Sequence, residues 1–174
     1  MDLLKLCGEP LYFEEPLGEE PEGLIKEASL RYAEGTAEPL LLRAYFLAPT
    51  HLSVLVSLYR FYYYQHRLRD AQIVADRALA VAAQRLGFPD DWRELSLRHL
   101  GEGVPLNMGL VRFYLMTLKA AGYLALRCGE VEPGLAMLEK LTEMDAGDRL
   151  GSHVLLDVAR RAQATARGGA PYPD

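Results

Sequence analysis

AEPLLLRA at residues 37–44 and AQIVADRA at residues 71–78 are the two stretches that decide the fold. Both carry small or apolar residues at matching helical positions: Ala37, Leu41 and Ala44, and then, 34 residues later, Ala71, Ala75 and Ala78. Small side chains at this spacing let two antiparallel helices pack closely, while larger apolar residues reach the neighbouring pair. The repeat therefore predicts a series of helical hairpins.

A third copy of the pattern lies nearer the C-terminus. Its small and apolar positions are Leu118, Ala121, Gly122, Ala125, Gly134, Leu138 and Leu141. The stretch between Cys128 and Gly134 is typical of one helix ending and another beginning. Ala71 and Gly134 are 63 residues apart, so an insert interrupts the 34-residue register before this copy.

The three copies resemble the tetratricopeptide repeat family, whose 34-residue motif is a helix–turn–helix with small residues where its helices touch. The resemblance covers residues 18–51, 52–85 and 115–148. It implies an all-α fold of antiparallel helix–turn–helix repeats forming a solenoid, with an irregular insert and a C-terminal capping helix.

The segments on either side of the repeats complete the expected organisation. We expect an acidic N-terminal arm at 1–17, two repeats at 18–85, an insert with a short helix and the start of a long helix at 86–114, a third repeat at 115–148, a capping helix at 149–165 and a flexible tail at 166–174. Asp90 or Asp91 is the expected N-cap of the short helix. Residues 101–105 should break the chain before a long helix that starts near residue 106.

The expected capping helix is amphipathic. Its predicted apolar side consists of Leu150, Val154, Leu155, Val158 and Ala162. A terminal helix of this kind covers the exposed end of a repeat stack.

Composition and charge exclude several classes of function. The net charge is −5, which argues against a protein that binds nucleic acid through a basic surface. No stretch approaches 18 uninterrupted apolar residues, so we expect no membrane span and a cytoplasmic location. Cys7 and Cys128 lie far apart without metal-ligand spacing, so we expect reduced thiols, no metal site and no cofactor.

The chain also lacks a recognisable catalytic motif. Its four histidines, at 51, 66, 99 and 153, have no helical partner four residues away. The glycines at 101 and 103 follow no predicted strand, so they do not form a phosphate loop. We therefore expect no enzymatic activity.

The aromatic run YRFYYY at residues 59–64 indicates a binding surface. Consecutive helical positions point in different directions, so these five rings cannot all enter one core. The family pattern implies that the leading helices form a concave groove, and the residues expected to bind a partner there are Lys26, Arg60, Tyr63, Tyr64, Lys119, Tyr123 and Arg127. Tyrosine and arginine dominate protein-binding hot spots. We expect the partner to be another protein, offering an acidic or aromatic segment.

Other occupants of this groove are open. The protein's own N-terminal arm or C-terminal helix could cover the tyrosines, or the groove could be buried in a homodimer. A further alternative is a helical enzyme or ligand sensor whose pocket is lined by Tyr63, Tyr64, Tyr123 and Trp92.

Two short stretches carry a second resemblance. YFEEPLG at residues 12–18 and LYRFYYYQHRL at residues 58–68 are similar to small tetratricopeptide-like proteins of bacterial nitrogen-fixation gene clusters. This resemblance implies an adaptor, scaffold or assembly chaperone that serves metalloenzyme assembly. Secretion-system chaperones of the same repeat class are the alternative context.

Overall fold

The computed structural model describes residues 15–32 and 35–168, and every regular element in those ranges is a helix. The elements in chain order are α1 (Glu19–Leu30), α2 (Ala37–Leu47), α3 (Leu52–Tyr64), α4 (Leu68–Leu86), the short 3₁₀ helix η3 (Trp92–Glu94), α5 (Leu97–Arg127), α6 (Val131–Met144) and α7 (Ser152–Gly168). The predicted all-α class is confirmed. Residues 1–14 of the expected arm and 169–174 of the expected tail lie outside the described residues.

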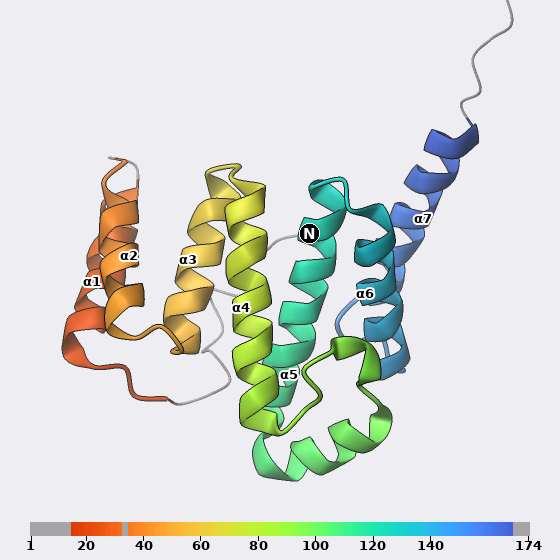
Figure 1. Cartoon of the computed structure of the whole chain (residues 1–174), viewed down its shortest axis with the longest axis horizontal. Helices are drawn as coiled ribbons and strands as arrows, with labels where there is room; N and C mark the ends of the chain where they lie inside the picture. Colours follow the sequence, from red (N-terminus) through yellow and green to blue (C-terminus); the bar gives the residue numbers. More distant parts are fainter. Residues whose placement is uncertain (1–14, 33–34, 169–174) are drawn as a thin grey trace, which may run out of the picture.

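The helices pair as three antiparallel hairpins, α1–α2, α3–α4 and α5–α6, which stand side by side with α7 at the end (Figure 1). These hairpins correspond to the expected repeats at 18–51, 52–85 and 115–148. The small residues that define the repeat are in the core: Ala37, Ala44, Ala71, Ala75 and Ala78 have no exposed surface. In Figure 1, α2, α4 and α6 form the nearer layer, with α1, α3 and α5 behind them.

The third hairpin closes on two glycines. A Cβ atom added at Gly134 would lie 2.9 Å from the carbonyl oxygen of Gly122 and 2.7 Å from Cγ of Leu126. A Cβ atom at Gly122 would lie 3.0 Å from Cβ of Met137. The small residues of this copy therefore allow α5 and α6 to touch through their backbones.

The insert differs from the prediction in one respect. Asp91 caps η3 as expected, its carboxylate accepting from the Arg93 amide at 3.0 Å. The expected break at residues 101–105 was wrong, because α5 begins at Leu97 and continues through Pro105. The interruption lies at Asn107, whose backbone is extended and whose side chain accepts from the Leu110 amide at 2.9 Å. Asn107 thus caps the second half of α5.

The last helix begins and ends three residues later than predicted, and only part of its predicted apolar side is buried. It extends to Gly168, whereas we expected it to end at Thr165. Leu150 and Leu155 of the predicted apolar side pack against the core, but Val154 and Val158 are 68% and 59% exposed, so the prediction was wrong for these two valines. Leu156, which was not predicted, is buried against α6. Within the described ranges, no helix has both the length and the apolar content needed to cross a bilayer.

Candidate partner-binding face

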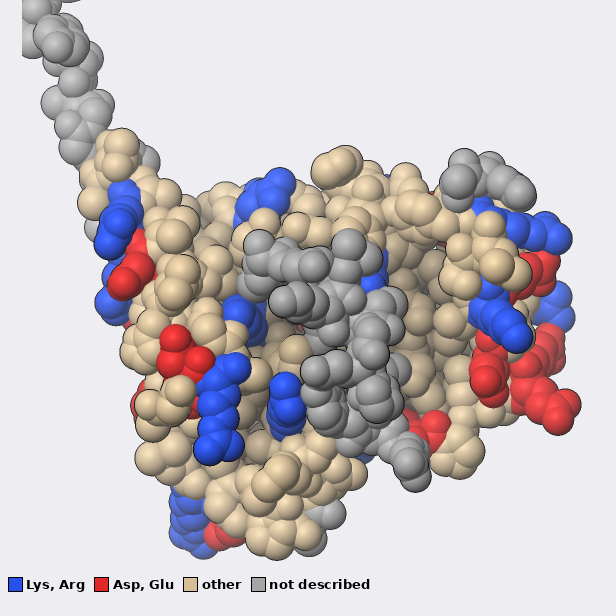
Figure 2. Space-filling model, turned by 180° about the vertical axis from the view of Figure 1, so that it is seen from behind, with Lys and Arg blue, Asp and Glu red and all other residues tan. Residues whose placement is uncertain are grey.

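The first helices of the hairpins, α1, α3 and the second half of α5, form one face of the molecule, here called the first-helix face. Figure 2 views the molecule from this side and shows acidic side chains gathered at the α1 end. Glu19, Glu20 and Glu22 in the first turn of α1 account for part of this charge. Lysine and arginine side chains lie among them at this end and also across the rest of the view, and further acidic side chains lie towards the opposite end, where α7 stands.

A cavity of about 530 Å³ opens between the α1–α2 hairpin and α3; we call it the hairpin pocket. It is lined by Ile25, Ala28, Ser29, Tyr32, Ala37, Leu41, Ser57, Arg60, Phe61 and Tyr64. The walls are mostly apolar, with one cation, Arg60, and two serine hydroxyls. Volume and lining both match those of protein sites that hold a small molecule or an anchoring side chain.

Three tyrosine rings continue from this pocket towards α5 and form the ring row. Tyr64, on the pocket wall, meets Tyr63 edge to face with 5.3 Å between ring centroids. Tyr63 in turn lies 6.2 Å from the ring of Tyr123 on α5. Aromatic pairs at these separations stabilise a structure in addition to the effect of burying their apolar surface. The row therefore joins α3 and α5 across the face.

Hydrogen bonds fix the orientation of these rings. Arg127 Nη1 donates to the Tyr123 hydroxyl oxygen at 2.8 Å, and its guanidinium lies 5.8 Å from the centroid of that ring. Burial raises the pKa of Tyr63, and its hydrogen bond to Tyr123 adds to the rise. Burial also opposes ionisation of Tyr123, but hydrogen bonds from Tyr63 and Arg127 outweigh it and lower the pKa of Tyr123. The Tyr123 oxygen thus acts as the shared acceptor of a pre-arranged network.

The other expected site residues fall in different surroundings. Arg60 is buried at 9% exposure in the wall of the hairpin pocket. Lys26 is exposed on α1. Lys119 donates to the Leu150 carbonyl in the loop before α7, and burial lowers its pKa despite the opposing effect of Asp148. The ammonium of Lys119 therefore helps to hold α7 in place.

The sequence prediction missed the pocket wall that is supplied by α1 and by Tyr32 just after it. Ile25, Ala28, Ser29 and Tyr32 line the pocket, whereas only Lys26 of this helix was predicted. The missed positions follow the spacing i, i+3, i+4 and i+7, which marks one face of a helix. This periodicity is the signal that could have identified them.

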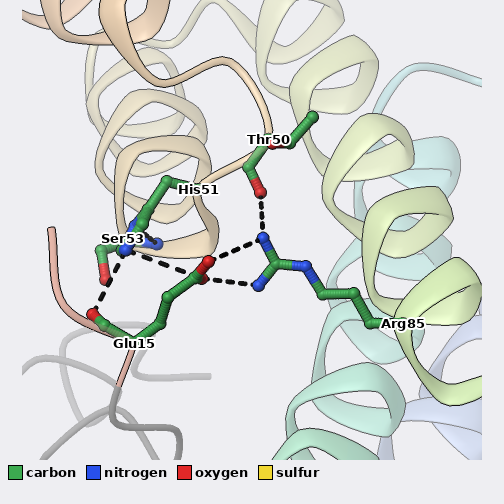
Figure 3. Close-up of polar contacts among 5 residues, drawn as sticks. All are labelled: Glu15, Thr50, His51, Ser53 and Arg85. Atoms are coloured by element: carbon green, nitrogen blue, oxygen red, sulfur yellow. Dashed lines mark hydrogen bonds and ion pairs between the residues drawn. The ribbon is translucent and has the colours of Figure 1, made fainter.

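A second missed feature is a polar cluster at the start of α3, the Glu15 clamp, formed by Glu15, His51 and Arg85 (Figure 3). Arg85 donates to both carboxylate oxygens of Glu15, at 2.6 and 3.1 Å, and to the Thr50 carbonyl at 2.8 Å. His51 Nδ1 accepts from the Ser53 amide at 3.2 Å, so Nε2 carries the proton and donates to the Glu15 carbonyl at 3.3 Å. The clamp fixes the chain just before α1.

Trp92 lies apart from the ring row. It lines a second hollow of about 320 Å³ with Asp76 of α4, Tyr114 of α5 and Met137 of α6. The structure therefore does not bring Trp92 together with the tyrosines at 63, 64 and 123 as the small-ligand alternative supposed. Within residues 15–32 and 35–168, no group of three or more His, Cys, Asp or Glu side chains is arranged to hold a metal ion.

The fold and the first-helix face define the class: an all-α protein of stacked helical hairpins that presents an apolar pocket beside a row of tyrosines. The chain is 49% identical over 158 residues to a protein of Azotobacter chroococcum mcd 1 named "Uncharacterized 19.8 kDa protein in nifW 5'region", covering 91% of this chain and 88% of that protein. The chain belongs to the family of that Azotobacter protein. Neither a protein-family model nor a solved structure matches this chain.

The name of the relative supports the resemblance to proteins of nitrogen-fixation gene clusters. The tetratricopeptide resemblance rests on the repeat residues and on the helical fold.

Proposed function

We propose that this protein is a non-catalytic binding module that holds a segment of another protein along the first-helix face. One observation carries the proposal: Tyr64 belongs both to the hairpin pocket and to the ring row. The hairpin pocket, as an apolar anchor site, and the ring row therefore form one surface that extends from α1 to α5. A surface of this shape suits an elongated segment with one buried anchor.

The chemistry of the face suggests the composition of that segment. Tyrosine and arginine bury a large area while keeping a polar end, and they dominate hot spots of binding. The exposed cations Lys26 and Arg127 stand on α1 and α5 beside this surface. A segment with an apolar or aromatic anchor and flanking carboxylates would be complementary in both shape and charge.

The placement of the histidines supports a non-catalytic role. His51 accepts from the Ser53 amide at the start of α3, and His99 accepts from the Ser96 amide at the start of α5. His66 and His153 are exposed at or near helix ends. Each ring sits where a helix begins or ends, away from the pocket lining, so its position is explained by the fold.

We further propose that the module serves nitrogen fixation, as an adaptor, scaffold or assembly chaperone. The support is the family relationship to a protein whose name refers to the nifW region. A secretion-system chaperone would use the same kind of face, but the relationship favours the nitrogen-fixation context.

Affinity capture from the native host, grown under nitrogen-fixing conditions, tests the proposal. The double variant Lys26→Glu with Arg127→Glu reverses the two exposed cations, and Arg77→Glu on α4 is the matched control because that side chain is exposed away from the face. Arg60 and Lys119 are unsuitable for charge reversal because both are at least partly buried. We expect one partner to be retained by the wild type and the control, with affinity for the double variant reduced at least tenfold.

Two results would contradict the proposal. Equal affinity of the double variant and the control would remove the first-helix face from binding. A stable dimer in light scattering, with no partner captured, would assign the face to self-association.

A further inference from the structure

The Glu15 clamp places the start of the described chain at a defined point of the fold. Glu15 is bound to the beginning of α3 through His51 and to the end of α4 through Arg85 (Figure 3). Two residues later, Leu17 packs against the apolar cluster of Leu24 and Val54. The residues that precede Glu15 therefore start from a fixed position on the surface.

This fixed position lies close to the hairpin pocket. His51 caps α3, and the pocket residues Ser57 and Tyr64 follow it by six and thirteen residues on the same helix. At a rise of about 1.5 Å per residue, they lie roughly 9 and 20 Å along the helix axis from the clamp. Cys7 precedes Glu15 by eight positions, and an extended chain of that length reaches about 27 Å. The pocket is within reach of the arm.

The arm also has the composition that the pocket requires. Residues 3–13 contain six large apolar side chains: Leu3, Leu4, Leu6, Leu11, Tyr12 and Phe13. Residues 1–14 hold three acidic side chains and one basic side chain, and the charged side chain on the pocket wall is a cation, Arg60. A segment tethered this closely has an effective concentration on the order of millimolar, so modest intrinsic affinity is enough to occupy the site.

We propose that residues 3–13 of the arm dock in the hairpin pocket of their own chain, and that the partner must displace them to bind. The docked arm covers the apolar walls of the pocket and is held near it by the Glu15 clamp. The docking does not depend on the proposed function. The competition with a partner rests on it, because only then is the pocket also the partner's anchor site.

Disulfide trapping in the full-length protein tests the docking without a partner. The native Cys7 lies in the middle of residues 3–13, and Cys128→Ser removes the other thiol of the chain. Ser57→Cys then places a second thiol in the hairpin pocket. Oxidised glutathione is the oxidant: it takes up the two electrons and two protons released when the two thiols join.

Ala80→Cys is the matched control. Ala80 is exposed on α4 and lines the second hollow, and it precedes Arg85 by five residues, or about 7.5 Å along the helix. Ala80 and Ser57 therefore lie at similar distances along their helix axes from the clamp, so an arm that moved without a preferred site should show no strong preference for Ser57. Each closure rate is divided by the reaction rate of the introduced thiol with oxidised glutathione in a Cys7→Ser chain, which corrects for accessibility.

We expect the corrected rate of intramolecular closure to be at least tenfold higher for Ser57→Cys than for Ala80→Cys. Ser29→Cys, at the opposite wall of the pocket, should behave like Ser57→Cys and guards against a local disturbance of α3. Equal rates at the pocket and control positions would overturn the proposal. A disulfide-linked dimer as the main product in dilute solution would also overturn it, because the arm would then occupy the pocket of a second copy.

The two proposals can fail separately. If trapping succeeds and the capture experiment finds no partner, the docked arm is a structural element and the binding function is wrong. If trapping fails while the double variant loses its partner, the face binds that partner without competition from the arm.

Discussion

The contact between α5 and α6 and the contact between the α1–α2 hairpin and α3 are built from the same kind of repeat but end in opposite results. At the first, Gly122 and Gly134 bring the helix backbones together so closely that a single Cβ atom would collide. At the second, a cavity of about 530 Å³ remains. Small residues thus bring the helices into direct contact at α5–α6, but leave a cavity between the α1–α2 hairpin and α3. We call these the closed contact and the open contact.

The difference lies in what faces the small side chains. Gly134 contacts the backbone and the Leu126 side chain of the neighbouring helix, so no empty space remains beside it. Ala28, Ala37 and Ser57 line the hairpin pocket, and no larger described side chain fills the space between them. Small residues specify a fold where backbones meet and leave a binding site where they do not.

The closed contact gives the largest expected effect. Gly134→Ala places a methyl group 2.9 Å from the Gly122 carbonyl oxygen, and the backbone must shift to relieve the overlap. We expect the free energy of unfolding, measured by urea denaturation, to fall by about 1–3 kcal/mol.

Gly101→Ala is the control for this substitution. Gly101 is in α5, and no atom outside its own turn lies within 4 Å of an added Cβ atom. Alanine in an open helical position should raise the free energy of unfolding by about 0.5–1 kcal/mol. A loss of stability at both positions would mean that the α5–α6 contact has no special role.

The open contact between the α1–α2 hairpin and α3 should make the amides of this hairpin exchange with solvent faster. α1 and α2 each have three buried residues, whereas α4 has eight, so the α1–α2 hairpin should open without global unfolding. We expect amides of α2 to exchange at least tenfold faster than those in the middle of α4. Exchange measured by mass spectrometry on peptides from both helices checks this, and equal protection would contradict the comparison.

The Glu15 clamp should limit that opening. Glu15→Gln removes one charge of a partly buried pair with Arg85, and we expect about threefold faster exchange in α1 and α2, with α4 and α6 unchanged. Glu20→Gln is the matched control because its pair with Arg43 is more exposed, at 54% and 65% of the side chains, and should change exchange less.

The sequence predicted the closed parts of the fold better than the open ones. The alanine spacing at residues 37–44 and 71–78 was sufficient to predict the hairpins, because small residues at helix contacts repeat with the chain. The break near residue 103 was misplaced: Gly101 and Gly103 are helical, and the interruption depends on Asn107 capping a new segment. Glycine and proline alone do not determine where a helix is interrupted.

The candidate site was predictable in part. Tyr63, Tyr64 and Tyr123 were predicted from the aromatic run and the repeat pattern, and the structure places them in one row. The Glu15 clamp joins Glu15 and Arg85, which are 70 positions apart, and no local sequence pattern predicts such a pair. Lys119 was predicted to bind a partner, but its ammonium donates to the Leu150 carbonyl in the loop before α7.

The smallest expected effect tests the closed half of the molecule through Asp76. Asp76 of α4 is exposed as a residue, but its carboxyl lies in the second hollow, where partial burial, together with the nearby charge of Glu130, raises its pKa to about 6. In the unfolded chain the carboxyl ionises near its ordinary value of 3.8. Between these two pKa values the folded state keeps a proton that the unfolded state has lost, so this group lowers stability as pH rises.

Asp76→Asn should remove that dependence. We expect the variant to be more stable than the wild type above pH 6, with the difference shrinking as the pH falls towards 4. Urea denaturation at intervals from pH 4.5 to 8 checks this, with Asp157→Asn on α7, an exposed aspartate, as the control. A difference in the free energy of unfolding that stays constant with pH would mean that water solvates the Asp76 carboxyl fully. The hollow between α4 and α6 would then be as open to solvent as the surface of the α1–α2 hairpin.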